Sequence, residues 1–583
     1  MVRSRARRTR LVALLTAVGL ALAACGGNDD DGSADDGAGD GAETGGDEGP
    51  DYAWAKAFAD HPGAAAGPFR LKEWEKGSFV TLERNPDYGG EPAGVQEITF
   101  RFVPSPEQPA ALANGEVDVI YPQPQIDLVE QVRDLDGVRF DASFGVTWEH
   151  ITYNLANPVL ADVRVRQAIG LAVDRQALVD TLMKPFSDDA TVLQNHVYVN
   201  NQPEYAENAG EFAARDLERA GALLDAAGWT VGPDGVREQD GKKLVLRIAT
   251  TGGDTLRERT EELLQAQLKD AGIELRIENA PAAGVFDVVF GGEATAQDWD
   301  LALFAWVGTP TAALDYTGIY GTGQGNNPGG YSNEQVDALL ARATAEVDDT
   351  ARAALMNQLD QVLWRDPPNL PLYQKPTFVA YKDTIENVVD NTSAEGLTWN
   401  ADKWTRTDGG DTITIAAEQE LSGWNTNLST TNELWAAMVA RLVWPQGYFV
   451  TPDVRFEVGH AFAKEAEVVS KDPFTVRWTI NPDAVWNDGV PVSSDDLEYY
   501  WQSCNGVVDE GEPVLEEEGE KVTGVDCINT TGYDRVETFT KVDEKTAEAV
   551  FTEPIAEYEA LFSTPFPPAH LAREYDASVA GGK

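Results

Sequence analysis

The body of the chain alternates between hydrophobic patterns typical of strands and patterns typical of helices. Residues 244–248 place leucine or isoleucine at every second position, which indicates a half-buried strand. Residues 255–271 then carry leucines on one helical face, and Asp254 is suited to be the N-cap. Residues 273–277 return to strand-like alternation. This stretch therefore predicts a β-α-β unit.

Further amphipathic segments extend this pattern along the chain. A helix is expected over 216–227, where Gly228 would end it, and another is expected to begin near Asn333. The fold class predicted is therefore α/β or mixed α+β. At 583 residues, with 42% hydrophobic residues, the chain is too long for one core and should form several domains.

The N-terminus has the composition of an export signal. Five arginines precede residues 11–24, an apolar stretch that is too short to span a bilayer. Cys25 follows two alanines, an arrangement that resembles the bacterial lipobox and predicts lipidation of its thiol. Arg7 and Arg8 leave twin-arginine export open beside the general route. Residues 26–51 contain no basic residue and are expected to form a disordered acidic stalk.

The net charge limits the partners that the body can bind, and the cysteines bear on a disulfide expected outside the cell. The chain has 97 acidic and 45 basic residues, a formal net charge of −52. Because nucleic acids and anionic membranes bind positive surfaces, neither is an expected partner of the body. The acidic surface mildly favours cationic ligands. Outside the cell, Cys504 and Cys527 are expected to form a disulfide, and two buried free thiols are the alternative.

Signatures of enzymes and of metal sites are absent from the sequence. The five histidines are far apart and form no H-E-x-x-H pair, and neither a G-x-S-x-G elbow nor a Walker A loop occurs. Gly321, Gly323 and Gly325 are followed by Asn326 rather than by a helix start, so they predict a loop. The sequence therefore predicts no enzyme activity, no cofactor and no metal, although carboxylates distant in sequence could converge.

Six short motifs are distributed over the chain beyond residue 51. They are Gly67–Leu71, Leu82–Tyr88, Asn114–Asp118, Val163–Arg175, Trp486–Leu497 and Phe562–His570. Together they resemble the motifs of bacterial family 5 extracellular solute-binding proteins, which are the oligopeptide, dipeptide and nickel receptors of ABC importers. The most specific is the V-R-Q-A-I…A-D-R pattern that begins at Val163.

This resemblance implies a two-lobed fold of the type II periplasmic-binding-protein class, with hinge strands between the lobes and an extra domain on one lobe. It implies a receptor that closes over an oligopeptide or related small solute and delivers it to an ABC transporter permease. Together with a lipid at Cys25, it implies a monomer anchored at the extracellular face of the cell membrane.

The motifs occur in an order that differs from that of the family. In the family, the strand resembling Thr412–Ala417 follows the stalk, whereas here it follows the family's C-terminal piece. A circular permutation explains this order if the family's termini lie close together, and a rearranged sequence record is the competing explanation. The ends near Asp51 and Lys583 should then be neighbours.

The resemblance also implies how the chain is divided. The expected segments are a signal peptide and lipobox (1–25), a stalk (26–51), part of lobe I (52–150), a second lobe (151–375), a return to lobe I (376–404), a linker (405–411) and the family's N-terminal segment with the extra domain (412–583).

The position of the ligand follows from the same resemblance. Residues 303–310 resemble a strand-to-loop segment that lines the family's cleft, which makes Trp306, Gly308 and Thr309 expected ligand contacts. For Trp306 the alternative is core packing. Peptide receptors of the family bind the ligand's α-amine with an Asp three residues after this Trp, and here that position is Thr309. Unless Asp315 replaces this Asp, amine-poor ligands are favoured.

Six more residues are expected to reach the cleft because they lie at a strand exit or at the hinges. They are Trp424, Asn425 and Thr426 after the strand at 412–417, Tyr153 and Asn154 at the first hinge, and Tyr373 at the second. For the first three the alternative is a surface turn, and for the hinge residues it is packing within the hinge.

Two functions from other classes stay open at this stage. An extracellular lipoprotein hydrolase would need a catalytic constellation within the cleft. A cell-wall or partner-binding lipoprotein without a small ligand would have a flat, aromatic-poor surface between its lobes. Nickel is disfavoured as the ligand because a chain with five histidines offers few ligands for it.

Overall fold

The computed structural model describes residues 57–280, 299–308, 310–324, 326–428, 431, 433–505, 527 and 532–580. The expected signal peptide, the lipidation site at Cys25, the acidic stalk and Thr309 lie outside these residues. Within the described ranges, no helix has both the length and the apolar character that crossing a membrane requires.

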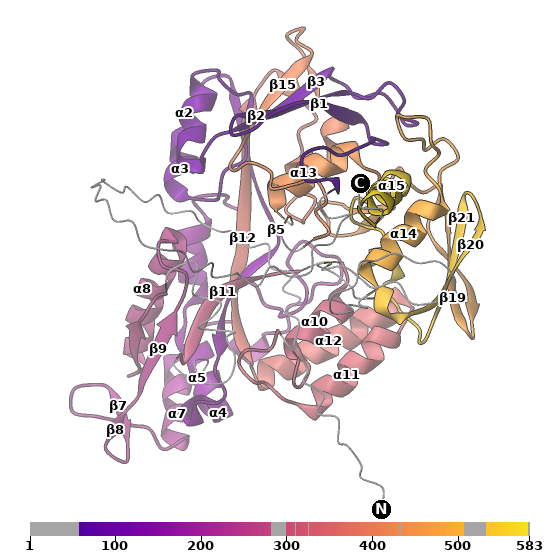
Figure 1. Ribbon diagram of the computed structural model, residues 1–583. Coiled ribbons are helices and arrows are strands. Elements are labelled where there is room, and N and C mark those ends of the chain that lie inside the picture. The colour runs from indigo at the N-terminus through magenta and orange to yellow at the C-terminus, as the bar shows by residue number, and fades with distance from the viewer. Residues whose placement is uncertain are drawn as a thin grey trace, which may run out of the picture.

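A ten-stranded mixed sheet runs through the molecule (Figure 1). Its strands, in spatial order, are β1 (Phe69–Glu75), β2 (Phe79–Arg84), β3 (Glu97–Phe102), β15 (Thr412–Ala417), β4 (Val119–Ile120), β12 (Asn369–Lys382), β5 (Val138–Tyr153), β11 (Leu301–Val307), β9 (Val245–Ala249) and β10 (Glu274–Ile277). Parallel pairs such as β9–β10 and antiparallel pairs such as β5–β12 both occur, with helices packed beside them. The predicted mixed α/β fold class is confirmed.

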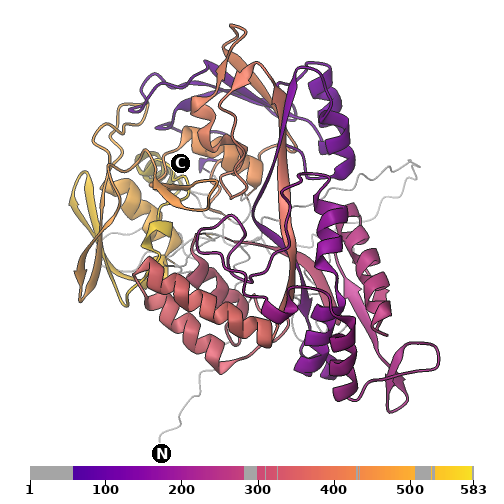
Figure 2. The same cartoon turned by 180° about the vertical axis from the view of Figure 1, so that it is seen from behind.

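Two long strands, β5 and β12, connect two lobes. They pair antiparallel from Thr152 opposite Asn369 to Val138 opposite Lys382. We call residues 57–145 and 376–580 lobe I, and residues 146–375 lobe II. Figures 1 and 2 show both strands running side by side from one lobe into the other. Their register shifts twice near the crossing point, between residues 371 and 373 and between residues 374 and 376 of β12.

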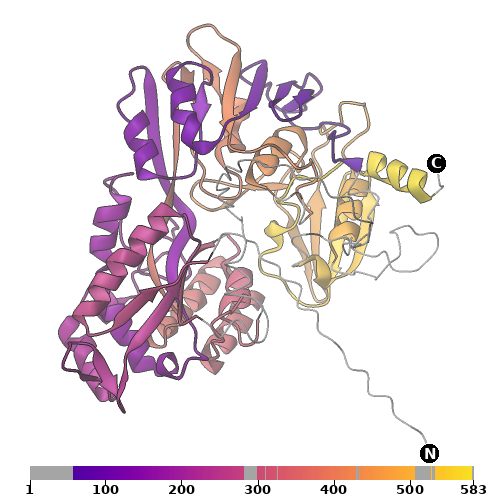
Figure 3. The same cartoon turned by 60° about the vertical axis from the view of Figure 1, so that its left-hand side comes forward.

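Lobe II is a sheet covered by helices on both faces (Figure 3). One face packs against α5 (Val163–Ala172), α7 (Leu217–Ala226) and α8 (Thr255–Asp270), and the other against α10 (Ala312–Tyr320), α11 (Glu334–Ala345) and α12 (Asp349–Arg365). The lobe also contains α4 (Pro158–Ala161), α6 (Arg175–Leu178), β6 (Thr230–Val231), β7 (Arg237–Gln239) and β8 (Lys242–Lys243). Side chains alternate along a strand, so Ile151 enters the first core and Trp148 the second.

Lobe I combines both ends of the described chain around one large core. Its helices are α2 (Gln108–Ala113), α3 (Ile126–Val132), α13 (Leu434–Val443), α14 (Ser494–Cys504) and α15 (Ala569–Ala580). A four-stranded sheet has the order β18 (Glu467–Lys471), β19 (Phe474–Thr479), β21 (Thr546–Phe551) and β20 (Val536–Asp543). There are also two two-stranded sheets in this lobe. One is β13 (Ile385–Glu386) with β14 (Thr405–Arg406), and the other is β16 (Tyr448–Val450) with β17 (Phe456–Val458). A disulfide joins Cys504 to Cys527, and both are buried in this core.

The helices and strands predicted from hydrophobic pattern are present. β9, α8 and β10 form the expected β-α-β unit, with Val245 opposite Glu274 in parallel register. The Asp254 carboxylate accepts hydrogen bonds from the backbone N–H groups of Leu256 and Arg257, which makes it the N-cap of α8. The helices expected over 216–227 and near Asn333 are α7 and α11.

The last part of the chain lies among the first part. β15 pairs in parallel with β3 on one side and β4 on the other. Near the start of the described body, a Cβ added to Gly63 would come within 2.8 Å of Leu571 on α15. Phe58 and Ala572 are buried in the same core. The two ends of the described body therefore meet on lobe I.

The arginines of the V-R-Q-A segment organise lobe II around the hinge. Arg166 is buried on α5 and pairs with Asp366, directly after α12. The buried guanidinium of Arg175 donates to the carbonyls of Leu193 at 2.7 Å, Phe212 at 2.9 Å and Pro371 at 3.1 Å. Because these carbonyls belong to separate segments, including hinge strand β12, this motif has a structural role here.

Replacing Arg175 by Met should lower the free energy of unfolding by about 2–4 kcal/mol, because three buried carbonyls lose their donor. Chemical denaturation measures this loss. The matched control is Arg164→Met in the same segment, since Arg164 is partly exposed and pairs with Asp162. Equal losses in the two variants would contradict the structural role of Arg175.

Candidate binding cavity between the lobes

A cavity of about 70 Å³ lies where the two lobes meet beside the hinge strands. Lobe II contributes Thr147 from β5, Val307 from the end of β11 and Lys375 from β12. Lobe I contributes the segment 121–124 after β4, Pro376 and Thr377 of β12, Thr392 and Ser393, and Leu434 and Trp435 at the start of α13. A ligand in this cavity would contact both lobes.

The walls of the cavity are mostly apolar. Pro122, Pro124 and Pro376 line it together with Val307 and Trp435. The Trp435 ring is held edge-on against Phe100 at 6.4 Å and Tyr121 at 6.3 Å between ring centroids, so it forms a fixed aromatic wall. The remaining lining offers hydroxyl and amide groups. Apolar walls with a few placed polar groups are typical of small-molecule sites.

Among the described lining residues, Lys375 carries the only charged side chain. It belongs to a buried cluster with Glu149, Asp254 and Arg257. The Arg257 Nε donates to Glu149 Oε1 at 3.0 Å, and the Lys375 Nζ is 3.7 Å from Glu149 Oε1 and 3.8 Å from Asp254 Oδ2. Burial alone would raise the pKa of Asp254, but Lys375 and Arg257 outweigh it and lower that pKa. The Asp254 carboxyl is therefore charged at neutral pH.

A second titratable group lies behind the cavity wall. The Thr377 hydroxyl donates to Asp390 Oδ2 at 2.5 Å, and Asp390 is buried. Burial raises the pKa of Asp390 to about 6, although hydrogen bonds from Thr377, Tyr121 and Ser143 oppose this shift. The Asp390 carboxyl thus connects two cavity residues, Tyr121 and Thr377, to the hinge strand β5.

Trp306, the tryptophan expected to contact the ligand, does not line this cavity. Its ring stacks on His150 at 5.7 Å and borders a smaller cavity of about 10 Å³ beside Tyr320. Successive side chains of β11 point to opposite faces, so it is Val307 that reaches the larger cavity. Gly308 follows the strand and donates its N–H to the Val146 carbonyl.

The other expected ligand contacts are buried in packing. The Trp424 ring packs edge-on against Trp74 at 6.1 Å, and Asn425 and Thr426 are almost fully buried beside it, so they are not a surface turn. The Tyr153 side chain enters the core of lobe II. Asn154 donates to the Trp299 carbonyl at 2.9 Å, and the Tyr373 hydroxyl lies 2.8 Å from the Thr260 hydroxyl. None of these residues lines the larger cavity here, and contact with a ligand stays a prediction for them.

Sequence reasoning missed the residues that do line the cavity. The segment Tyr121-Pro-Gln-Pro124 carries a signal, because an aromatic residue with two prolines directly follows a buried strand. Lys375 stands out as a basic residue next to Pro376 within an apolar strand. Nothing in the sequence distinguishes Trp435, because it is one of several apolar residues of an amphipathic helix.

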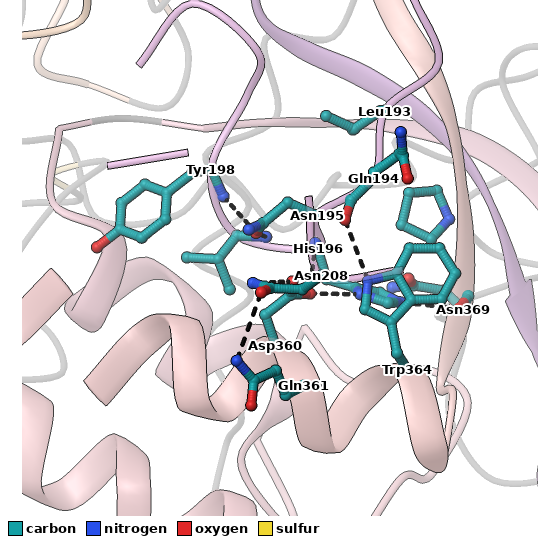
Figure 4. Close-up of polar contacts among 12 residues, drawn as sticks. Leu193, Gln194, Asn195, His196, Tyr198, Asn208, Asp360, Gln361, Trp364 and Asn369 are labelled. Carbon is teal, nitrogen blue, oxygen red and sulfur yellow. Dashed lines mark hydrogen bonds and ion pairs between the residues drawn. The ribbon is translucent and has the colours of Figure 1, made fainter. Parts of the chain in front are cut away.

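The most prominent histidine–carboxylate pair is that of His196 and Asp360, drawn in Figure 4. The His196 Nδ1 is 2.7 Å from Asp360 Oδ1, and Asn208 donates to Asp360 Oδ2 at 2.8 Å. His196 and Asp360 are fully buried, and neither lines the two cavities described above. The pair ties α12 to the segment 193–208. In the described part of the chain, no group of three or more His, Cys, Asp or Glu residues could hold a metal ion.

A buried acid joins the lobes at a second place. Glu557 of lobe I accepts hydrogen bonds from the backbone N–H groups of Ala313 and Leu314, at the N-terminus of α10 in lobe II. Its carboxylate is also 3.5 Å from the Arg352 Nε of α12. Burial, partly opposed by Arg352 and reinforced by Asp315, raises the pKa of Glu557 to about 8. The lobes are closed on each other at this contact.

The architecture and this cavity define the class of protein: a two-lobed α/β binding protein of the type II periplasmic class. Residues 41–328 match the family model described as "Bacterial extracellular solute-binding proteins, family 5 Middle". Over this stretch, just under half of its length, the chain is similar to this family.

Curated relatives support the same family. The "Oligopeptide-binding protein OppA" of Mycobacterium tuberculosis (strain ATCC 25618 / H37Rv) is 31% identical over 340 residues, which are 58% of this chain and 56% of the relative. "Protein XP55" of Streptomyces lividans is 30% identical over 305 residues, 52% of this chain and 54% of the relative. The chain thus spans about half the length of the curated relatives it matches.

Solved structures show the same fold. The "Periplasmic EDTA-binding protein EppA" has a TM-score of 0.53 and 26% identity, covering 58% of this chain and 64% of that one. A putative peptide binding protein AppA from Clostridium difficile has a TM-score of 0.51 and 23% identity, covering 58% of this chain and 67% of that one.

Raising the pH should weaken closure of the lobes, because Glu557 must bind a proton to remain buried without cost. The pKa of Glu557 is about 8 in this arrangement, and we expect an ordinary pKa once the lobes separate. The ratio of closed to open protein should therefore fall about tenfold between pH 7 and pH 9. Single-molecule energy transfer between one dye on each lobe measures this ratio without a ligand.

Glu557→Gln should flatten this pH dependence, because the amide still accepts the two N–H hydrogen bonds but does not titrate in this range. The control is Glu553→Gln, since Glu553 is exposed and pairs with Arg535. A profile that stays equally steep in Glu557→Gln would show that another group titrates on closure.

Proposed function

We propose that the protein is the lipid-anchored receptor of an ABC importer, which binds an oligopeptide or related small solute between its lobes and delivers it to the permease. The observation that carries this proposal is the cavity lined from both lobes beside the hinge strands. Occupation of such a cavity favours closure, since the ligand adds contacts that exist only when the lobes meet.

The family and its named members support the ligand class. The relative that is 31% identical is named an oligopeptide-binding protein, and the neighbour that is 26% identical is named an EDTA-binding protein. The described lining carries a single charged side chain and so offers no acid–base pair for a hydrolase. Its aromatic wall at Trp435 disfavours the flat surface expected of a protein without a small ligand.

The membrane anchor and the place of action rest on the sequence. Cys25 follows an apolar segment of signal-peptide length, and residues 26–51 provide an acidic spacer. We therefore place the body, as a monomer, at the extracellular face of the cell membrane beside the permease.

A panel of short peptides should raise the melting temperature of the protein, because a ligand that binds only the folded state stabilises it. For a peptide that does so, Trp435→Ala should weaken binding about tenfold or more, as for an aromatic anchor in a buried pocket. Calorimetry measures the dissociation constants.

The matched comparison is Trp306→Ala, which removes the tryptophan beside the smaller cavity. We expect a loss of at most a few fold, since its ring is separated from the larger cavity by the strand. If only Trp306→Ala weakens binding, the ligand lies on the other face of β11 and the proposed site is wrong.

We also propose that the chain is a circular permutation of the family order. Two observations support it: β15 lies between β3 and β4, and the first described residues contact α15. The match to curated relatives also covers only about half of each chain, as an interrupted order would produce.

Peptide mapping of the protein from its native cells tests this order. A protease that cleaves after glutamate should release residues 396–418 as one peptide, because no glutamate lies between Glu395 and Glu418. Mass spectrometry identifies it across the linker at 405–411. Peptides that instead join the stalk (26–51) directly to residues from 412 onward would show that the permuted order is not natural.

A further inference from the structure

The Lys375 side chain lines the interlobe cavity, and its ammonium group has no hydrogen bond to any described residue. The residue is only 8% exposed. Its two nearest carboxylate oxygens, on Glu149 and Asp254, are 3.7 and 3.8 Å from Nζ, beyond hydrogen-bonding distance. The three N–H donors of this group thus lack an acceptor at the wall of the cavity.

A second lysine shows how this chain satisfies such a group elsewhere. The half-buried Lys545 donates to the carbonyls of Asn481, Ala484 and Val492 at 3.2, 3.1 and 2.7 Å. A buried donor without a partner costs free energy, so it is normally paired. Lys375 has no such acceptor among the described residues, and a ligand in the cavity that it lines would supply one.

The electrostatics around Lys375 favour an anionic acceptor over a cationic one. The charges of Glu149 and Asp254 are balanced by Arg257 and Lys375, so the cluster is formally neutral. The cluster also surrounds the N-terminus of α8, a 16-residue helix that adds a partial positive charge. The local field thus differs from the acidic surface of the whole chain.

The remaining walls define the rest of the ligand. Prolines, Val307 and Trp435 also line the cavity. A group buried against such walls without penalty is apolar. The lining therefore combines one cationic side chain with apolar walls and a few hydroxyl and amide groups.

From this arrangement we propose that Lys375 determines specificity, and that it receives the carboxylate of a ligand whose body is apolar. The inference rests on the proposed solute-binding function and names the ligand class. An apolar peptide with a free C-terminus and an aromatic or aliphatic carboxylic acid share this chemistry.

Two matched pairs of probes test the proposal and separate these sources. One pair is the tripeptide leucyl-prolyl-phenylalanine and its C-terminal amide, and the other is 4-phenylbutyrate and 4-phenylbutyramide. In the unsubstituted protein, the acid of at least one pair should bind about tenfold or more tightly than its amide, as for a desolvated charged hydrogen bond. Calorimetry at neutral pH measures both affinities.

Lys375→Met should reduce the acid-to-amide ratio to about one while leaving the affinity for the amide nearly unchanged. Lys375→Arg should retain the ratio. The control is Lys382→Met, since Lys382 lies at the far end of the same strand, pairs with Asp118 and does not line the cavity. A lysine that only balances Glu149 and Asp254 would change the melting temperature but not the ratio.

The outcomes distinguish a failure of this inference from a failure of the proposed solute-binding function. Equal binding of acid and amide, unaffected by Lys375→Met, would overturn the role of Lys375 and leave a solute receptor. A preference for the acid that persists in Lys375→Met would also overturn it. If neither pair binds and no peptide stabilises the protein, the proposed function fails and this inference fails with it.

Discussion

The antiparallel pairing of β5 with β12 is the constraint on which the rest of the structure depends. The two strands belong to both lobes, and their register positions Thr147, Lys375, Pro376 and Thr377 at the interlobe cavity. The register shifts of β12 fall around residues 371–376, where the chain passes between lobes. Such irregularities change the direction of the side chains, often next to binding sites. Lys375 lies in this irregular part of β12.

Closure depends on contacts between segments that are far apart along the chain. The segment after residue 411 supplies Trp435 at the cavity wall and Glu557 at the N-terminus of α10. Lobe II supplies the partners of Glu557, Ala313 and Leu314, from the middle of the chain. Since these contacts require only spatial proximity, the same closed arrangement forms whichever segment comes first in sequence. The two ends of the described body meet on lobe I, so joining them and opening the chain elsewhere would also leave this arrangement intact.

The buried ionisable groups near the hinge are of two kinds, those that stabilise lobe II and those that lie between the lobes. Arg166 pairs with Asp366 after α12, and Arg175 donates to carbonyls that include Pro371 of the hinge strand β12. Lys375 and Glu557 lie where the lobes approach each other, so their surroundings change with closure. A charge whose solvation changes between two conformations couples that conformational equilibrium to ligand charge or to pH.

The sequence by itself determined the local structure and the resemblance to the family. Alternating and helical hydrophobic patterns, the Asp254 cap and the V-R-Q-A segment depend on neighbours in sequence, so the β-α-β unit and the mixed fold could be predicted. The face of each strand that meets the cavity could not, because alternation defines two faces without saying which is covered by packing. Hence Trp306 and Trp424 were expected at the ligand, whereas Val307, Lys375 and Trp435 line the cavity. Only tertiary packing brings Glu149, Asp254 and Lys375 from three separate segments to one place, and with them the charge that a ligand would meet.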